Sequence, residues 1–313
     1  MPGVPTDLID PSRELDDLFD RVPTLQGWRR EVSELSGGLT NNNYRVTTDD
    51  GGDYVVRVSE ASTGLLAIDR ENERFNTRAA GEAGVGARVV DSVPEAGVLV
   101  VQFLNGRTLQ MADVRDAAML PRIAAAVRKL HEGPAFQGSF DMRLIRRYYL
   151  SVVQERGYRL PDDYLDLQAQ VEELEEVMTA SVEELVPCNN DLLAGNFIDD
   201  GRQIWLIDYE YAGMNEASFE LGNIASESFL DPVQTRLLVS SYWGRDSELK
   251  LARARAWSLL ARYGWTLWAA IQDGASSIDF DFWSWGMEKY DSARAELHGP
   301  EYPQILRGLQ GDD

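Results

Sequence analysis

The spacing of apolar residues changes near residue 105, and this change limits the folds open to the 313-residue chain. Before it, apolar and polar residues alternate in short runs, as in residues 43–48 and 53–58 on either side of the glycine-rich turn 49–52. Such alternation is typical of half-buried strands joined in hairpins. After residue 105, apolar residues recur at helical spacing. The sequence therefore predicts an α+β fold with a small antiparallel β-sheet lobe and a mainly helical lobe.

The same patterns predict the individual elements. In the first lobe, residues 1–104, we expect strands at 32–35, 43–48, 53–58, 89–90 and 97–103, and a helix at 68–83. In the second lobe, residues 105–313, we expect helices at 111–131, 142–156, 164–185 and from 220 onward, with short strands at 196–198 and 203–207. The run 97–103 is almost wholly apolar, so this strand is expected inside the sheet.

Charge restricts the possible partners. The chain has 30 basic and 52 acidic residues, which give a formal net charge of −22 at pH 7. A surface with this much negative charge repels nucleic acids and anionic membranes. We therefore expect neither nucleic-acid binding nor membrane insertion. It would attract a cationic small molecule. The alternative is that the acidity serves only solubility or adaptation to salt.

Other features indicate the compartment. The single cysteine, Cys188, excludes an internal disulfide and fits a reducing environment. The N-terminus lacks the apolar core of a secretion signal, and the longest apolar run is too short to span a bilayer. We therefore expect a cytoplasmic protein. Because only two histidines occur, a multi-histidine metal site is not expected.

Residues 188–196 contain an aspartate and an asparagine five positions apart, Asp191 and Asn196, and Asp208 follows the apolar run 204–207. Phosphoryl transfer needs a carboxylate to accept the proton of the attacking hydroxyl, and oxygen ligands to hold Mg²⁺ against the phosphates. This order and spacing predict Asp191 as the catalytic base, with Asn196 and Asp208 as metal ligands. The alternative is that all three only end turns and strands. Each residue alone favours that alternative, but the combination favours catalysis.

Two features of the first lobe fit a nucleotide site. Paired glycines in residues 36–44 allow close approach of the backbone to a phosphate, although such a turn alone is more often a hairpin. Arg57 stands where kinases place a phosphate-binding cation, and its expected partner is Glu73, with Glu71 as the alternative. Arg57 could also be an ordinary outward strand residue. The candidate phosphate contacts in the loop are Ser36, Gly37, Gly38, Thr40, Asn41 and Asn43.

The end of the last strand in the first lobe is the expected junction of the two lobes. Gln102 and Leu104 lie there. Because backbone groups at such a junction would contact adenine, the identity of these side chains carries little information.

Residues 207–223 resemble the choline/ethanolamine kinases, within the wider aminoglycoside phosphotransferase-like superfamily. The family's run Ile-Asp-aromatic-Glu-Tyr, then Asn, then Phe-Asp/Glu-x-Gly-Asn is matched by residues 207–211, Asn215 and 219–223. The loop at 36–43 is similar to the family's Gly-Gly-x-Ser/Thr-Asn loop, and choline kinases are similar in using arginine at the position of Arg57. The resemblance covers residues 36–293. It implies a protein-kinase-like fold, with ATP in the cleft and Mg²⁺ as the metal.

The chain departs from the family pattern at Asn189. The family usually has histidine two residues before the catalytic aspartate, where it braces the loop backbone. Asparagine can also donate and accept hydrogen bonds, so we expect activity to survive.

Aromatic residues are frequent near the C-terminus. Trp265 and Trp268 are three positions apart and share a helix face, which on spacing alone fits a tryptophan-rich core better than a binding site. Aromatic faces also attract quaternary ammonium groups. Residues 263–272 look like the Trp-x-Leu-Trp segment that lines the choline pocket of choline kinases. The resemblance implies a substrate site formed by Tyr211, Glu227, Trp265, Trp268, Phe280 and Trp285.

The sequence thus predicts an ATP-dependent kinase that phosphorylates a small cationic amino alcohol. An aromatic box with one carboxylate suggests choline over ethanolamine, because a primary ammonium would require several hydrogen-bond acceptors. One alternative is a superfamily kinase acting on another amine-bearing alcohol, such as an aminoglycoside. The other is a catalytically silent module that binds a nucleotide or a quaternary amine. The reason to consider it is Asn189, which stands in place of the usual histidine. The oligomeric state is not predicted.

Overall fold

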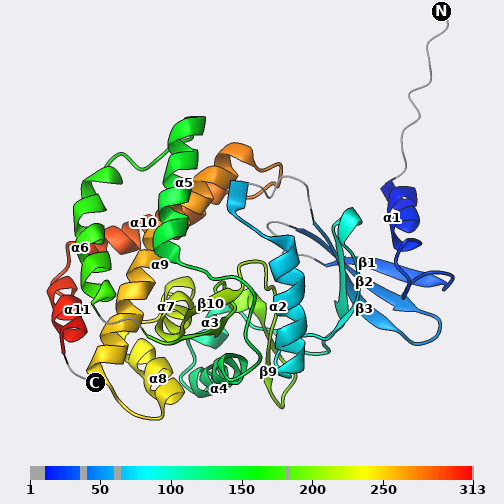
Figure 1. Ribbon diagram of the computed structural model, residues 1–313, viewed down its shortest axis with the longest axis horizontal. Coiled ribbons are helices and arrows are strands. Elements are labelled where there is room, and N and C mark those ends of the chain that lie inside the picture. Colours follow the sequence, from blue (N-terminus) through cyan, green and yellow to red (C-terminus); the bar gives the residue numbers. More distant parts are fainter. Residues whose placement is uncertain (1–10, 36–40, 60–64, 181–182, 312–313) are drawn as a thin grey trace, which may run out of the picture. The chain divides into compact units, whose positions relative to one another are not determined.

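The computed structural model describes residues 11–35, 41–59, 65–180 and 183–311 (Figure 1). The chain forms two compact units, Met1–Ala61 with Arg88–Phe103, and Ser62–Ala87 with Leu104–Asp313. Helix α2 (Arg70–Glu82), which the sequence placed in the first lobe, clusters with the second unit. The division of roles between residues 1–104 and 105–313 stays a prediction.

The first unit is built on a five-stranded antiparallel sheet with the strand order β1-β2-β3-β5-β4. Its strands are β1 (Arg30–Leu35), β2 (Asn41–Thr48), β3 (Asp53–Ser59), β4 (Val89–Val93) and β5 (Val98–Gln102), with the short helix η2 (Pro94–Ala96) before β5. Alternating residues such as Val98 and Val100 are buried on one face, in a core shared with Phe19 of helix α1 (Pro11–Phe19). Strand β5 lies between two neighbours, as its apolar sequence predicts.

The turn between β2 and β3 is the predicted hairpin. Gly51 there has φ +91°, a left-handed conformation that glycine adopts without the clash of a Cβ atom. Thr47 pairs with Asp53 across the turn, so the hairpin register follows from a tight connection.

The second unit is mainly helical and centred on α9 (Glu248–Ala275), which contacts α5, α7, α10 and α11 (Figure 1). Besides α2 and α9, its helices are α3 (Met111–Val114), α4 (Leu120–His131), α5 (Met142–Arg156), α6 (Gln168–Thr179), α7 (Ala217–Glu227), α8 (Pro232–Trp243), α10 (Phe282–Leu297) and α11 (Tyr302–Leu309). Within the described ranges, no helix is both long and apolar enough to cross a membrane.

Short strands and 3-10 turns frame the loops of this unit. They are β6 (Arg107–Thr108), η3 (Leu165–Leu167), β7 (Leu185–Cys188), η4 (Ala194–Asn196), β8 (Phe197–Asp199), β9 (Ile204–Leu206) and β10 (Gly213–Glu216). Strand β8 pairs with β6 and β9, and β7 pairs with β10. The predicted hairpin at 196–207 is therefore present.

Two predicted helices are shorter in the structure. The helix expected at 111–131 is divided into α3 and α4, because Asp116 accepts a hydrogen bond from the Ala118 amide and Pro121 favours a new helix start at Leu120. The helix expected at 164–185 ends at Thr179. Leu185, the last residue of the expected helix, instead begins β7. Both differences arise from local capping and strand pairing that override the apolar spacing.

Helices α7 and α9 pack closely because Gly222 has no side chain. A Cβ atom at this position would lie only 2.4 Å from the Ala254 carbonyl oxygen. A buried ion pair fixes the start of α7: Arg253 donates to the Glu216 carboxylate at 2.6 and 2.7 Å, and Trp257 Nε1 donates to it at 3.0 Å. Every residue of α7 is buried, so this helix is a rigid support for the loops that contact it.

Candidate active site

The loop between β7 and η4 carries Asp191, and its shape depends on Asn190. Asn190 has φ +68°, and such a left-handed backbone is costly outside glycine unless neighbouring groups hold it. Its side-chain Nδ2 donates to the Tyr211 carbonyl oxygen at 3.0 Å, and its Oδ1 accepts from Asn215 Nδ2 at 2.9 Å. Asn215 of the family motif therefore acts through Asn190.

Asn189 connects this loop to the segment that follows β9. Its Nδ2 donates to the carbonyl oxygens of Ile207 at 3.1 Å and Asp208 at 2.8 Å. Its Oδ1 accepts from the Asp191 amide at 3.1 Å. Asp208 itself has φ +63°, so the hydrogen bond to its carbonyl supports a strained residue. Asparagine at this position makes the kind of backbone brace expected of the histidine that it replaces.

Hydrogen bonds join Asn196 and the segment of Asp208 to this loop. Asn196 is buried, its Nδ2 donates to the Asp191 carbonyl oxygen at 2.7 Å, and its own carbonyl accepts from the Ile207 amide. Because the side-chain nitrogen of Asn196 is used in the hydrogen bond to Asp191, its side-chain oxygen Oδ1 is the atom that could bind a metal. An amide oxygen and a carboxylate are ligands that Mg²⁺ accepts, so these two residues fit a magnesium site.

The Asp191 carboxyl lies in an acidic environment. Its removal from water raises its pKa well above the usual range, and the negative charges of Glu227, Asp208 and Glu210 raise the pKa further. The nearby cation Lys289 acts in the opposite direction and lowers it. Cations that enter this region would therefore favour the ionised form of Asp191, which is the form that can accept a proton.

Glu220 of α7 binds the backbone of the loop that carries Asp191. Its two carboxylate oxygens accept from the amides of Asn189 and Asn190, each at 2.8 Å. Burial raises the pKa of Glu220 to about 7. The sequence shows Glu220 only as part of the family motif, without this role.

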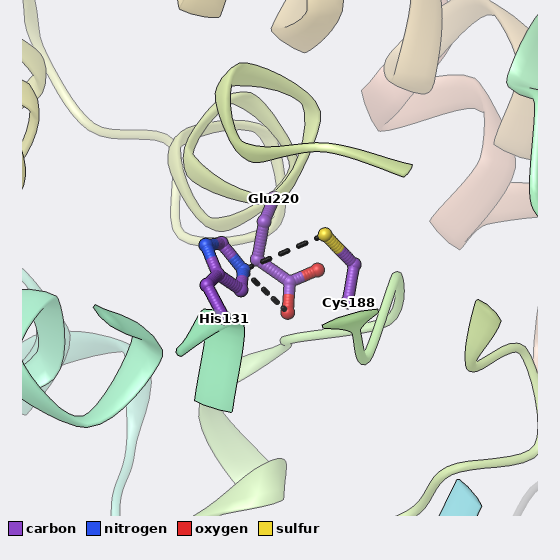
Figure 2. A group of neighbouring side chains, drawn as sticks. All are labelled: His131, Cys188 and Glu220. Carbon is purple, nitrogen blue, oxygen red and sulfur yellow. Dashed lines mark hydrogen bonds and ion pairs between the residues drawn. The ribbon is translucent and has the colours of Figure 1, made fainter. Parts of the chain in front are cut away.

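Two further buried side chains surround Glu220 (Figure 2). His131 Nε2 lies 3.5 Å from Cys188 Sγ and 4.0 Å from Glu220 Oε1, and burial lowers the pKa of His131 to about 3. In the described part of the chain these three form the one group of such side chains close enough to hold a metal ion. However, His131 Nδ1 is bonded to Tyr242 and both Glu220 oxygens hold loop amides, so the group is a structural brace.

The predicted aromatic residues gather in the same unit. The rings of Tyr211 and Trp265 are in edge contact with their centroids 5.3 Å apart, and those of Trp268 and Trp285 are in edge contact with their centroids 5.4 Å apart. Trp268 Nε1 donates to the Tyr211 hydroxyl at 2.9 Å, which joins the two pairs. Phe280 differs from the others: it is exposed, and its ring contacts Phe282.

A cation that the sequence did not suggest lies in this cluster. Lys289 Nζ lies 2.6 Å from Glu227 Oε2 and 4.1 Å from the centre of the Trp285 ring, and both charged side chains are buried. Lys289 follows Trp285 by four residues, one turn of α10, so the two share a face. That spacing is the signal that could have identified it.

The candidate nucleotide residues lie in both compact units. In the first unit, Asn43 pairs with Arg57 across β2 and β3, and Gln102 ends β5. Ser36, Gly37, Gly38 and Thr40 lie outside the described residues, whereas Asn41 begins β2 and is buried. The roles of these residues, and of Leu104 after β5, stay predictions.

In the second unit, Glu73 is buried on α2 and accepts from Arg70 Nη1 at 2.7 Å. The same nitrogen lies 3.4 Å from Glu210 Oε2, so Arg70 joins α2 to the segment after β9. The pairing of Glu73 with Arg57 stays a prediction.

Comparison with known proteins places this geometry in a family. The sequence model described as choline/ethanolamine kinase matches residues 32–237, more than half of the chain. The chain belongs to the choline/ethanolamine kinase family. It is therefore a member of a family of phosphotransferases, and the resemblance seen in residues 207–223 is confirmed.

Relatives and solved structures agree with this assignment. A probable ethanolamine kinase from Arabidopsis thaliana is 25% identical over 90% of this chain and 83% of its own. A choline/ethanolamine kinase family protein from Mesorhizobium loti has a TM-score of 0.83 and 27% identity, covering 96% of this chain and 99% of its own. The choline kinase LicA from Streptococcus pneumoniae has a TM-score of 0.77 and 23% identity over 91% of this chain and 98% of its own. LicA has also been solved with AMP. The predicted protein-kinase-like α+β fold is confirmed.

Proposed function

We propose that this protein is an ATP- and Mg²⁺-dependent kinase that phosphorylates the hydroxyl of a small amino alcohol such as choline or ethanolamine. The observation that carries the proposal is the hydrogen-bonded loop in which Asn196 and Asn189 hold Asp191 and Asp208 together. Kinase chemistry depends mainly on this positioning of a base beside metal ligands. A cytoplasmic location is part of the same proposal.

In the proposed reaction, the hydroxyl oxygen of the amino alcohol attacks the γ-phosphorus of ATP. The bond between this phosphorus and the bridging oxygen breaks, ADP leaves, and the hydroxyl proton passes to the Asp191 carboxylate. When bound to Asn196 and Asp208, Mg²⁺ would offset the charge of the phosphates. Asn41, Asn43, Arg57 and the loop at 36–40 are the proposed phosphate contacts.

The aromatic cluster supports a small organic cation as the acceptor. Tyr211, Trp265, Trp268 and Trp285 supply ring faces and edges, and Glu227 supplies a carboxylate near Asp191. Aminoglycosides, by contrast, are recognised mainly through carboxylates. A silent binding module is less favoured, because Asn189 makes backbone hydrogen bonds of the kind expected from the missing histidine.

The direct test is ADP release with choline, ethanolamine and an aminoglycoside side by side, with and without Mg²⁺, at low and high salt. We expect turnover with an amino alcohol that is lost in the Asp191→Ala variant, while nucleotide binding remains. Turnover with the aminoglycoside alone would support a different kinase of the superfamily. Nucleotide binding without turnover of any acceptor would support the silent module.

A further inference from the structure

The carboxylate expected to receive the substrate's ammonium group already has a resident cation. Lys289 Nζ lies 2.6 Å from Glu227 Oε2, and both side chains are buried. A buried charge of this kind is stable only with such a partner, so the ion pair is a fixed part of the aromatic cluster. The net charge that Glu227 offers to a second cation is therefore small.

Lys289 also lies against one of the aromatic rings. Its Nζ is 4.1 Å from the centre of the Trp285 ring, a distance typical of a cation–π contact. Attraction to a ring face is the main way in which a quaternary ammonium is held, because it has no hydrogen to donate. With Trp285 engaged by Lys289, a second cation at this ring would meet a like charge.

One oxygen of Glu227 has no hydrogen-bond donor among the described residues. Among the described residues, Glu227 Oε1 is buried and has no hydrogen-bond partner, whereas Oε2 binds Lys289. A buried carboxylate oxygen without a donor is unfavourable, and an N–H group from a ligand would satisfy it. Primary, secondary and tertiary ammonium groups carry such an N–H group, and a quaternary ammonium does not.

We propose that Lys289 determines the amine specificity of this site, so that it prefers amino alcohols whose nitrogen carries at least one hydrogen over quaternary ones. This inference rests on the proposed function. It also reverses the preference for choline expected from the aromatic residues alone, because that expectation did not include Lys289.

The test uses four acceptors of equal charge: ethanolamine, N-methylethanolamine, N,N-dimethylethanolamine and choline. Binding of each to the full-length protein is measured by calorimetry, and kcat/KM is measured with ATP and Mg²⁺. We expect the largest step between dimethylethanolamine and choline, with choline at least about tenfold weaker, because a charge-assisted hydrogen bond is lost only there.

Two variants test the role of Lys289 itself. Lys289→Met removes the charge and releases the Trp285 ring, so we expect the choline-to-ethanolamine ratio of affinities to rise about tenfold. Lys289→Arg keeps the charge and should keep the order of the four amines. Lys250→Met is the matched control: Lys250 pairs with Glu183 at 2.9 Å and lies 4.5 Å from the Trp243 ring centre, but has no part in the site.

The outcomes separate the two proposals. If choline binds as tightly as dimethylethanolamine in the unchanged protein, the specificity inference is wrong, whether or not Lys289→Met folds. An unchanged ratio in a folded Lys289→Met variant would also reject it. If none of the four is phosphorylated, but choline binds more weakly than the amines with an N–H group and this difference shrinks in a folded Lys289→Met variant, the proposed function fails and the role of Lys289 stands.

Discussion

The side-chain amide of Asn189 donates a 2.8 Å hydrogen bond to the carbonyl oxygen of Asp208. The donor precedes the expected catalytic base by two residues, and the acceptor is an expected metal ligand. One short side chain thus fixes the separation between the two halves of the site, although they are 19 residues apart in the sequence.

Replacing Asn189 tests this brace. We expect Asn189→Ala to lower kcat by about tenfold or more, because two partly buried carbonyls lose their donor at a cost of about 1 kcal/mol or more each. Nucleotide affinity should change little. Asn189→His, the residue usual in the family, should retain most of the activity. Steady-state kinetics and nucleotide titration measure both, and an unchanged kcat in Asn189→Ala would show that the brace is dispensable.

Replacing Asp191 tests its proposed role as the base. Asp191→Asn keeps the size of the side chain but removes its ability to accept the hydroxyl proton, so we expect kcat to fall by about 10²- to 10⁴-fold. Binding of ADP, measured by calorimetry, should be preserved. Comparable turnover in this variant and the natural protein would exclude Asp191 as the base.

The buried pair of Arg253 and Glu216 should be essential for stability. Arg253→Met leaves the Glu216 carboxylate buried without its cation, and the free energy of unfolding should fall by about 3–5 kcal/mol. Arg236→Met is the matched control, because the pair of Arg236 and Glu248 is exposed and should contribute less than about 1 kcal/mol. Urea unfolding measures both, and equal losses would contradict the difference in burial.

Close packing at Gly222 gives a second stability prediction. Gly222→Ala places a Cβ atom 2.4 Å from the Ala254 carbonyl oxygen, so α7 must move away from α9. We expect a loss of about 1–3 kcal/mol in the free energy of unfolding. Gly195→Ala is the control, since the nearest atom there, Leu193 Cδ1, is 3.6 Å away. A Gly222→Ala variant as stable as this control would show that the two helices can separate freely.

Glu220 should make stability depend on pH. Burial raises its pKa from 4.5 to about 7, so the folded chain binds the proton more tightly than the unfolded chain. This contribution is greatest at low pH, and it declines by about 3 kcal/mol as pH rises from about 4.5 to about 7. Urea unfolding between pH 5 and 8 should show a flatter profile for Glu220→Gln than for the natural protein. A steeper profile for the variant would contradict the raised pKa.

The sequence predicts most of the fold and the chemical core of the site, because these depend on local patterns. Residues 53–58 alternate and form a strand, and hydrogen bonds join the short segments that carry Asp191, Asn196 and Asp208, whose catalytic roles stay predictions. Lys289 could not be assigned in this way. Its partner Glu227 is 62 residues away, and an isolated lysine on a helix is normally solvated.

Sequence patterns also fail to predict helix ends where packing and strand pairing decide them. The apolar spacing around Leu185 continues that of α6, yet Leu185 pairs with Glu216 on β10. Long-range strand pairing of this kind leaves no periodic trace in so short a segment.

The position of Cys188 has a practical consequence. It is the single cysteine of the chain, it is fully buried, and it lies one residue before Asn189. A thiol reagent can reach it only when the surrounding segment opens, so its labelling rate reports local unfolding next to the loop that carries Asp191. Slower labelling with nucleotide than without it would report, without any introduced probe, how strongly ligand binding tightens this part of the protein.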